Sequence, residues 1–179
     1  AIVVGIIDKN GGIINKTGYS FEEIKSLLNT RSSNFLESKE LLSFEHINKE
    51  IWSIGAEIFI PAAASRLLSQ NQLDQLIENN LEVISCGANV PFADKEIFFG
   101  PISESADQRV SVIPDFIANC GMARAFSYFM QDNCEIKDIA IFEAVSKTIK
   151  SALKKVYEKN NTRNNISKTA LEIALKELV

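Results

Sequence analysis

Short apolar runs alternate along the chain with segments of helical periodicity. The runs are rich in β-branched residues and end at Asp, Pro or Gly, which is typical of buried strands. These strands are expected over 2–7, 57–60, 81–85 and 110–113. Elsewhere apolar residues recur every three or four positions, which indicates amphipathic helices. The helices are expected over 21–28, 43–52, 69–78, from 93 onward, and over 118–130, 136–157 and 168–178, with a polar loop over 30–38.

Several helix ends carry recognisable capping signals. Ser20 and Glu23 have the spacing of a capping box before the first helix. Asp94 is placed to favour the N-terminus of a helix that starts near Ala93. Ser167 can cap the last helix. Ile13 and Ile14, by contrast, indicate only a short extended excursion before a turn.

Strands that alternate with helices predict an α/β fold, with a mostly parallel sheet flanked by helices. In such a sheet the ligand crevice lies at the carboxyl ends of the strands. The residues that would line it are Asp8, Pro61, Gly87 and Pro114. We assign residues 1–135 to this domain and residues 136–179 to a C-terminal helical segment that packs on it.

Composition and charge exclude several classes of function. Hydrophobic residues make up 46% of the 179 positions and charged residues 23%, as in ordinary globular proteins. A net charge of −4 gives no overall attraction to nucleic acid or anionic lipid. No apolar run approaches the ~20 residues that span a bilayer, and the opening AIVVGIID lacks a basic leader. We expect a cytoplasmic protein that binds neither nucleic acid nor a membrane.

The cysteines and the histidine do not form a metal or disulfide pattern. Cys86, Cys120 and Cys134 are odd in number and lack CxxC spacing, so we expect them to be reduced. The single histidine, His46, cannot build a multi-histidine cage and reads as a polar helix residue in FEHINKE. We therefore expect no metal site.

Asp8 closes the first strand and has two possible roles. An acidic residue at this point of a parallel sheet can accept hydrogen bonds from the hydroxyls of an adenosine ribose. The same side chain could instead begin the turn DKNGG.

Small residues and amides follow the later strands. Ala62 and Ala63 follow one strand, and Gly87 and Asn89 follow the next, so that a flat ring could lie against the backbone near an amide. Asn119, in PDFIANCG, has two donors and an acceptor and can hold a carboxamide in one orientation. Each segment also has a purely structural interpretation, as a turn or as a helix cap.

Taken together, these segments resemble a known family. GAEIFIPAA, GAN with a proline two residues on, and PDFIANCG are similar, in order and spacing, to the C-terminal dinucleotide-binding domain of the glutamate/leucine/phenylalanine/valine dehydrogenases. The opening VVGIIDKNGGI resembles that family's second Rossmann strand. The resemblance implies a Rossmann-like sheet whose first strand is missing here, and oxidative deamination of an L-amino acid to a 2-oxo acid and ammonia.

The resemblance also implies roles for individual residues. Asp8 would contact the adenosine ribose, and Ala62 and Ala63 would flank the nicotinamide side of the crevice. Asn89, in the turn opened by Gly87, and Asn119 would hold the nicotinamide ribose and carboxamide. The cofactor would be NAD, because Asp8 would repel a 2′-phosphate, with NADP possible because Lys9 beside it could offset that repulsion.

The helix after Asn119 would line the substrate pocket through Ala123 and Phe126. Phe126 falls where glutamate-specific members carry a small hydroxyl residue, so an apolar amino acid is favoured as substrate, because a buried phenyl ring would leave the γ-carboxylate unpaired. Ser127, one residue on, could restore the hydroxyl through a local bulge.

Other positions depart from the family pattern. Cys86 replaces an acidic residue before GAN, Met122 replaces a glycine, and Arg124 adds a charge. An alternative function is therefore a non-catalytic interaction or regulatory module on the same scaffold.

The missing first strand has consequences for folding and activity. That strand is central in the Rossmann order 3-2-1-4-5-6, so either more protein belongs upstream or the sheet rearranges. The family's catalytic lysine and aspartate belong to an N-terminal domain, so we expect no catalytic residue in this chain and no activity from it alone. Its partners would be that domain, an amino-acid substrate and further copies in a homo-oligomer.

Overall fold

The computed structural model describes residues 1–30, 35–132 and 134–177. Residues 31–34 of the expected polar loop and residue 178 of the last expected helix lie outside the described residues. Contacts divide the chain into two compact units, the first made of residues 1–57 and 71–81, the second of residues 58–70 and 82–179. The boundary expected after residue 135 falls inside the second unit, and the division of roles at that point stays a prediction. Among the described residues, no helix combines the length and hydropathy needed to cross a bilayer.

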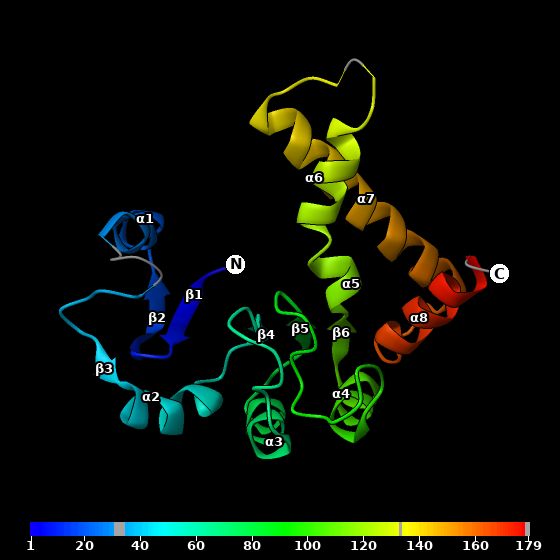
Figure 1. The fold of residues 1–179 in the computed structure, drawn as a ribbon. Helices are drawn as coiled ribbons and strands as arrows, with labels where there is room; N and C mark the ends of the chain where they lie inside the picture. Colours follow the sequence, from blue (N-terminus) through cyan, green and yellow to red (C-terminus); the bar gives the residue numbers. More distant parts are fainter. Residues whose placement is uncertain (31–34, 133, 178–179) are drawn as a thin grey trace. The chain divides into compact units, whose positions relative to one another are not determined.

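The first unit is built on an antiparallel sheet in the order β1-β2-β3 (Figure 1). Its strands are β1 (Val3–Asp8), β2 (Gly11–Tyr19) and β3 (Leu42–Ser43). Its helices are α1 (Phe21–Thr30), α2 (Phe44–Glu50), the 3₁₀ turn η1 (Ile51–Ser53) and α3 (Gln70–Glu78). Ile13 and Ile47 are buried at its centre.

The hairpin in this unit corrects two expectations. Ile13 and Ile14 belong to a nine-residue strand rather than a short excursion, and β1 is partly exposed instead of buried on both faces. The reason is the turn after Asp8. Asp8 pairs with Gly11 across a two-residue loop, which reverses the chain at once into an antiparallel partner.

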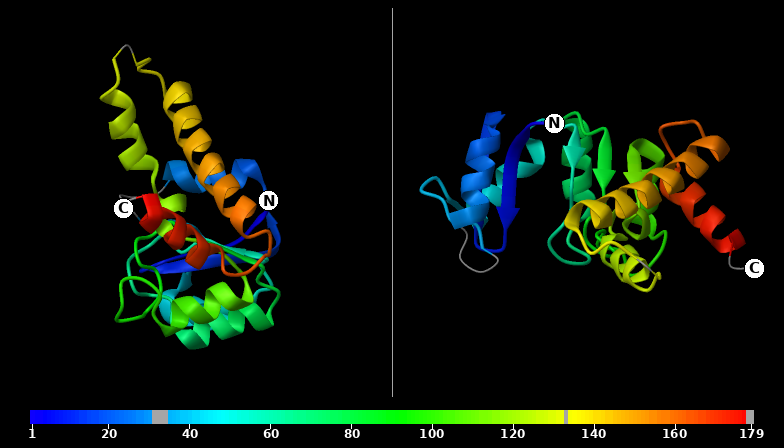
Figure 2. Two further views of the ribbon diagram at one scale, coloured as in Figure 1. Left: turned by 90° about the vertical axis from the view of Figure 1, so that its right-hand side faces the viewer. Right: turned by 90° about the horizontal axis from the view of Figure 1, so that it is seen from above.

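The second unit holds a parallel sheet in the order β4-β5-β6, flanked by helices. Its strands are β4 (Ile58–Phe59), β5 (Val83–Ser85) and β6 (Ser111–Ile113). Its helices are α4 (Pro101–Arg109), α5 (Asp115–Ala118), α6 (Gly121–Phe129), α7 (Asp138–Lys159) and α8 (Ile166–Glu177). The predicted α/β class, with its parallel sheet and C-terminal helices, is confirmed. Figure 2 shows α6 and α7 side by side as a helical hairpin.

The capping box is formed as predicted, but the other two helix starts differ. The backbone N–H of Ser20 donates to Glu23 at 2.7 Å, and that of Glu23 donates back to the Ser20 hydroxyl at 3.3 Å. No helix begins near Ala93. The helix begins at Pro101 instead, because proline suits the first helical position, and Asp94 folds back to accept from its N-terminal N–H groups.

The cap of α8 comes from a different helix. Both oxygens of Asp107, on α4, accept backbone N–H groups, one from Ser167 at 2.8 Å and one from Lys168 at 2.9 Å. The Ser167 hydroxyl was expected to fill this role. A buried carboxylate satisfies two end groups of the helix at once, which a single hydroxyl cannot.

The apolar helix expected over 118–130 is divided. α5 ends at Ala118 and α6 begins at Gly121, with Asn119 in a non-helical conformation between them. This break moves the Asn119 side chain off the continuous helix surface and toward the ends of the strands.

Candidate functional site

The loops that follow β4 and β5 are in direct contact. The backbone N–H of Ala88 donates to the carbonyl of Pro61 at 2.7 Å. A Cβ added to Gly87 would lie 3.1 Å from the Cβ of Ala62, which is tighter than ordinary packing. Glycine therefore allows the two turns to approach without a shift of Ala62. Since parallel strands end at one edge, Ala62 and Gly87 meet where the sequence placed a ligand crevice.

Two side-chain amides meet at this same edge. Nδ2 of Asn119, after β6 and α5, donates to Oδ1 of Asn89, after β5, at 2.8 Å. Both side chains are solvent-accessible at this contact. The bond uses one donor of Asn119 and the acceptor of Asn89, so the pair keeps an acceptor on Asn119 and donors on both. Such a pair can recognise a group that has both a donor and an acceptor, as a carboxamide does.

Asp115 joins this cluster through the backbone. One carboxylate oxygen accepts the N–H of Val90 at 2.7 Å, and the other accepts the N–H of Phe116 at 2.8 Å. In the sequence, Asp115 is the aspartate of PDFIANCG, and no partner was expected for it. Its signal was the Pro-Asp pair directly after a buried strand.

Asp8 lies in the first unit, and its position relative to the Asn89–Asn119 pair is not defined. One carboxylate oxygen accepts the N–H groups of Asn10 and Gly11, and the other accepts that of Leu36 at 2.6 Å. The turn-forming role of Asp8 is thus realised. The cationic Nζ of Lys9, next to it, lies 4.5 Å from the centre of the Phe35 ring.

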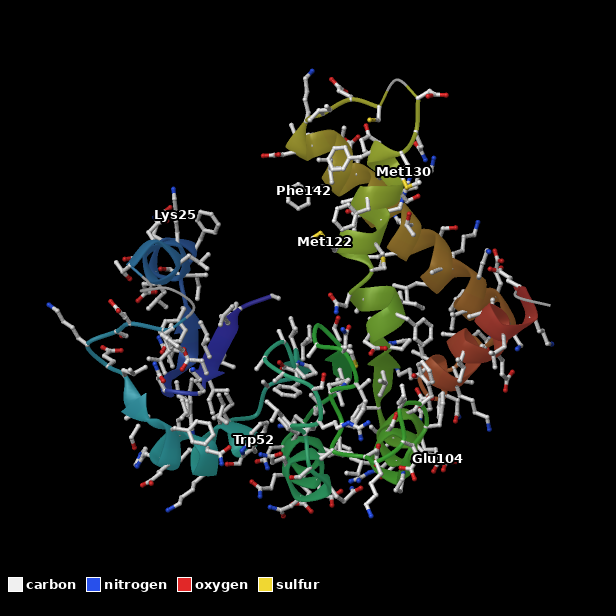
Figure 3. All side chains as sticks on the ribbon, in the orientation of Figure 1. Lys25, Trp52, Glu104, Met122, Met130 and Phe142 are labelled. Carbon is white, nitrogen blue, oxygen red and sulfur yellow. The ribbon has the colours of Figure 1, made fainter. Side chains whose placement is uncertain are left out.

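The expected substrate-pocket residues lie on α6. Ala123 is exposed, and 63% of the Phe126 surface is exposed as well, although the sequence analysis treated this ring as buried. α6 packs against α7, and among the described residues nothing covers its outer side. Met122 and Phe142 both point to one side of the α6–α7 hairpin (Figure 3). Arg124 is directed to α7, where its Nε donates to the Thr148 hydroxyl at 3.1 Å.

This outer side forms an exposed apolar face, which we call the α6–α7 face. Its members are Met122 and, one turn further along α6, Phe126, together with Phe142 and, one turn earlier on α7, Ile139. A face of this kind on a folded unit is typical of a surface that another domain or chain covers.

Cys86 places a neutral thiol directly before residues 87–89, which we call the GAN turn. Its side chain is 1% exposed, and burial raises the pKa of the thiol to about 12, with a smaller contribution from the nearby carboxylate of Asp115. The acidic residue that the family resemblance implies here is therefore replaced by an uncharged one. The described residues hold no group of three or more His, Cys, Asp or Glu side chains that could bind a metal ion.

Cavities do not enclose the candidate site. A cavity of about 40 Å³ behind the GAN turn, lined in part by Cys86 and Asp115, has room for a few water molecules only. A larger apolar cavity of about 260 Å³ lies by Val83 and Ser111, which are the first residues of β5 and β6.

Comparisons with known proteins show the family and the fold of this chain. The profile of the Glutamate/Leucine/Phenylalanine/Valine dehydrogenase family matches residues 1–179. An NADP-specific glutamate dehydrogenase from Psychrobacter sp. (strain TAD1) is 25% identical over 161 residues, which cover 88% of this chain and 35% of that protein. The enzyme of the same name from Escherichia coli (strain K12) is 27% identical over 97 residues, which cover 51% of this chain and 21% of that protein.

Solved structures share the fold. A glutamate dehydrogenase of Plasmodium falciparum superposes with a TM-score of 0.64 at 15% identity over 99% of this chain, and glutamate dehydrogenase 2 of the same organism with 0.65 at 17% over 97%. In both cases the match covers 40% of the other chain. The chain thus spans well under half the length of these relatives. With the full-length profile match, these likenesses establish that the chain belongs to the glutamate/leucine/phenylalanine/valine dehydrogenase family.

Proposed function

We propose that the second unit forms the nicotinamide half of a dinucleotide-binding site in an NADP-dependent L-amino-acid dehydrogenase. The observation that carries the proposal is the pair of amides, Asn89 and Asn119, hydrogen-bonded at the carboxyl edge of a parallel sheet. A carboxamide and a ribose hydroxyl have donors and acceptors that can bond to the groups this pair leaves free. Ala62, Ala63 and Gly87 provide a surface without bulky side chains on which the pyridine ring can rest.

NADP replaces NAD as the favoured cofactor. The relatives reported above carry the name NADP-specific glutamate dehydrogenase. Asp8 argued for NAD through repulsion of a 2′-phosphate, but its carboxylate already accepts three backbone N–H groups, which offset part of its charge. Lys9 adds a cation beside it. A contact of Asp8 with the adenosine ribose stays a prediction from the sequence.

The chain supplies binding and orientation to the reaction. A bound nicotinamide, held by Asn89 and Asn119, would supply the hydride acceptor for oxidative deamination of the amino acid to a 2-oxo acid and ammonia. Asn89 and Asn119 fix one face of the ring toward the substrate, and Ala123 and Phe126 border the substrate's side chain. Catalytic groups come from a further domain, which covers the α6–α7 face and excludes water, in a protein that assembles as a homo-oligomer.

The experiment is a titration of NADPH against the full protein that contains this chain. Binding is expected, and Asn119→Ala should weaken it by about tenfold because a buried carboxamide then lacks a partner. Asn161→Ala, at an exposed loop position of the same unit, is the matched control and should leave affinity unchanged. Failure to bind either NADPH or NADH, with stable self-association, would favour the non-catalytic module.

That alternative has its own support in Cys86 and Met122. One is a buried neutral thiol where the family resemblance implies an acid, and the other is an exposed side chain where it implies glycine. An interaction module would keep the α6–α7 face as a binding surface but would not bind a nucleotide. The same titration separates the two functions.

A further inference from the structure

We infer that Asp115 is a positioning residue that holds the turn carrying Asn89 in the conformation needed to meet Asn119. The inference deepens the proposed function and rests on it. Asp115 does not point at the amide pair itself. It acts on the backbone of the residue that follows Asn89.

The backbone at Val90 is strained. Its φ is +46°, in the left-handed region that β-branched residues rarely adopt. Strain of this kind persists only where surrounding contacts hold it, and it is found most often at functional sites. The sequence offers a valine here rather than a glycine, so the conformation must be imposed from outside.

Both backbone polar groups of Val90 are held. Its N–H donates to the Asp115 carboxylate at 2.7 Å, and its carbonyl accepts the N–H of Arg66 at 2.7 Å. The bond to Asp115 is the charge-assisted one and is therefore the stronger of the two. The bond to Asp115 orients the peptide that links Asn89 to Val90, and the bond to Arg66 orients the next peptide, which links Val90 to Pro91.

One short helix delivers both contacts to the turn. Asp115 is the first residue of α5 and Asn119 directly follows its last, and the N–H of Asn119 donates to the carbonyl of Asp115 at 2.7 Å. The Asp115 side chain thus holds the backbone of the turn while the Asn119 side chain holds its amide. Because one short helix fixes the loop after β5 at two points, the Asn89 side chain is held in one orientation.

The test compares three variants with the wild type in the full protein. Asp115→Ala should weaken NADPH binding roughly tenfold, through loss of a charge-assisted hydrogen bond. Val90→Gly in the same chain should restore affinity to within about threefold, because glycine adopts positive φ without strain. Val90→Gly alone should bind as the wild type does. Glu143→Gln, an exposed carboxylate on α7, is the control and should have no effect.

A second readout does not depend on nucleotide. In the free protein, the side-chain amide resonance of Asn119 should shift in Asp115→Ala and return in the double variant, because its bond to Asn89 is lost and regained. An unchanged resonance in Asp115→Ala overturns the inference, and so does a double variant that resembles Asp115→Ala in both readouts while its circular dichroism is native. If the wild type binds no nucleotide, the proposed function fails, whereas the resonance still tests the role of Asp115.

If Asp115→Ala does not fold, the more conservative variant Asp115→Asn provides a second test. Asp115→Asn keeps one side-chain oxygen that can accept a backbone N–H, but it places an amide NH₂ group, which is a donor, against the second backbone N–H. It should therefore show a smaller shift of the Asn119 resonance in the same direction. A resonance identical to that of the wild type would contradict the inference.

Discussion

Cys86 shows how one buried side chain sets the chemistry of the GAN turn. Burial raises the pKa of its thiol from 9.0 to about 12, so the thiol is neutral at any physiological pH. A reactive cysteine needs the opposite environment, electropositive and partly exposed. Cys86 therefore serves as a small apolar group between the turn and β6, where its backbone N–H continues the ladder by donating to Ile113 at 3.1 Å.

Thiol labelling tests this assignment. At pH 8 the thiolate fraction of Cys86 should be roughly a thousandfold below that of an ordinary thiol, since three pKa units separate them. Iodoacetamide should modify the half-exposed Cys120 and Cys134 and leave Cys86 unmodified until the chain is unfolded. Peptide mass spectrometry measures the result, and rapid native labelling of Cys86 would show that the thiol is accessible.

The same shift predicts the direction of a pH effect on stability. An unfolded chain releases the Cys86 proton near pH 9, whereas the folded chain keeps it to about pH 12. The folded state therefore binds more protons over this range, and the free energy of unfolding falls as the pH rises through it. Urea unfolding at pH 8.5 and 10.5 should show a smaller loss in Cys86→Ala than in the wild type.

Helices in the second unit depend on carboxylates supplied from outside their own sequence. Asp94 caps α4 from the preceding loop, and Asp107 caps α8 from another helix. The second contact joins two segments that lie 60 residues apart in the chain. It also couples the N-terminus of α8 to the helix that flanks β6, so α8 is docked by its end as well as by its apolar side.

Removing the Asp107 carboxylate should destabilise the N-terminus of α8. Asp107→Ala leaves one buried and one partly buried N–H group of α8 without an acceptor and should lower the free energy of unfolding by about 2 kcal/mol. Urea denaturation followed by circular dichroism measures the change. Glu104→Ala, an exposed position on the same helix, should change it by less than about 0.5 kcal/mol. Equal effects of the two substitutions would argue against Asp107 as the cap.

The described residues of the second unit leave the α6–α7 face uncovered. Phe126 and Phe142 are 63% and 70% exposed, and Met122 at the start of α6 is 69% exposed. Isolated folded domains rarely expose so many large apolar side chains together. A further domain, as proposed, would bury them.

Self-association of the isolated chain tests this interpretation. By itself the chain should form concentration-dependent oligomers in sedimentation velocity, because the exposed face can only be buried against another copy. Phe126→Lys with Phe142→Lys should shift the distribution toward monomer, since a buried lysine would be unpaired. Leu175→Lys, an exposed apolar residue on α8, is the control and should leave the distribution unchanged. A wild-type chain that stays monomeric would contradict the prediction.

Local sequence pattern was sufficient for the elements and for the meeting of the two amides. Strand and helix periods are encoded within a few residues, so β4, β5, β6 and most helices could be located from the sequence. Asn89 and Asn119 each follow a strand of one parallel sheet, and such strands end at the same edge, so their proximity could be anticipated. Their role toward a cofactor stays a prediction.

The tertiary structure alone decided which distant groups complete each local feature. The carboxylate of Asp107 on Ser167, that of Asp115 on Val90 and the exposure of Phe126 all depend on contacts between segments far apart in the chain. The local sequence of a helix cap, a strained turn or an aromatic residue is the same whether or not a distant segment packs against it. The alternation of strands and helices, and the sheet edge where the two amides meet, follow from short-range periodicity. The groups that hold that edge in place follow from packing between segments far apart in the chain.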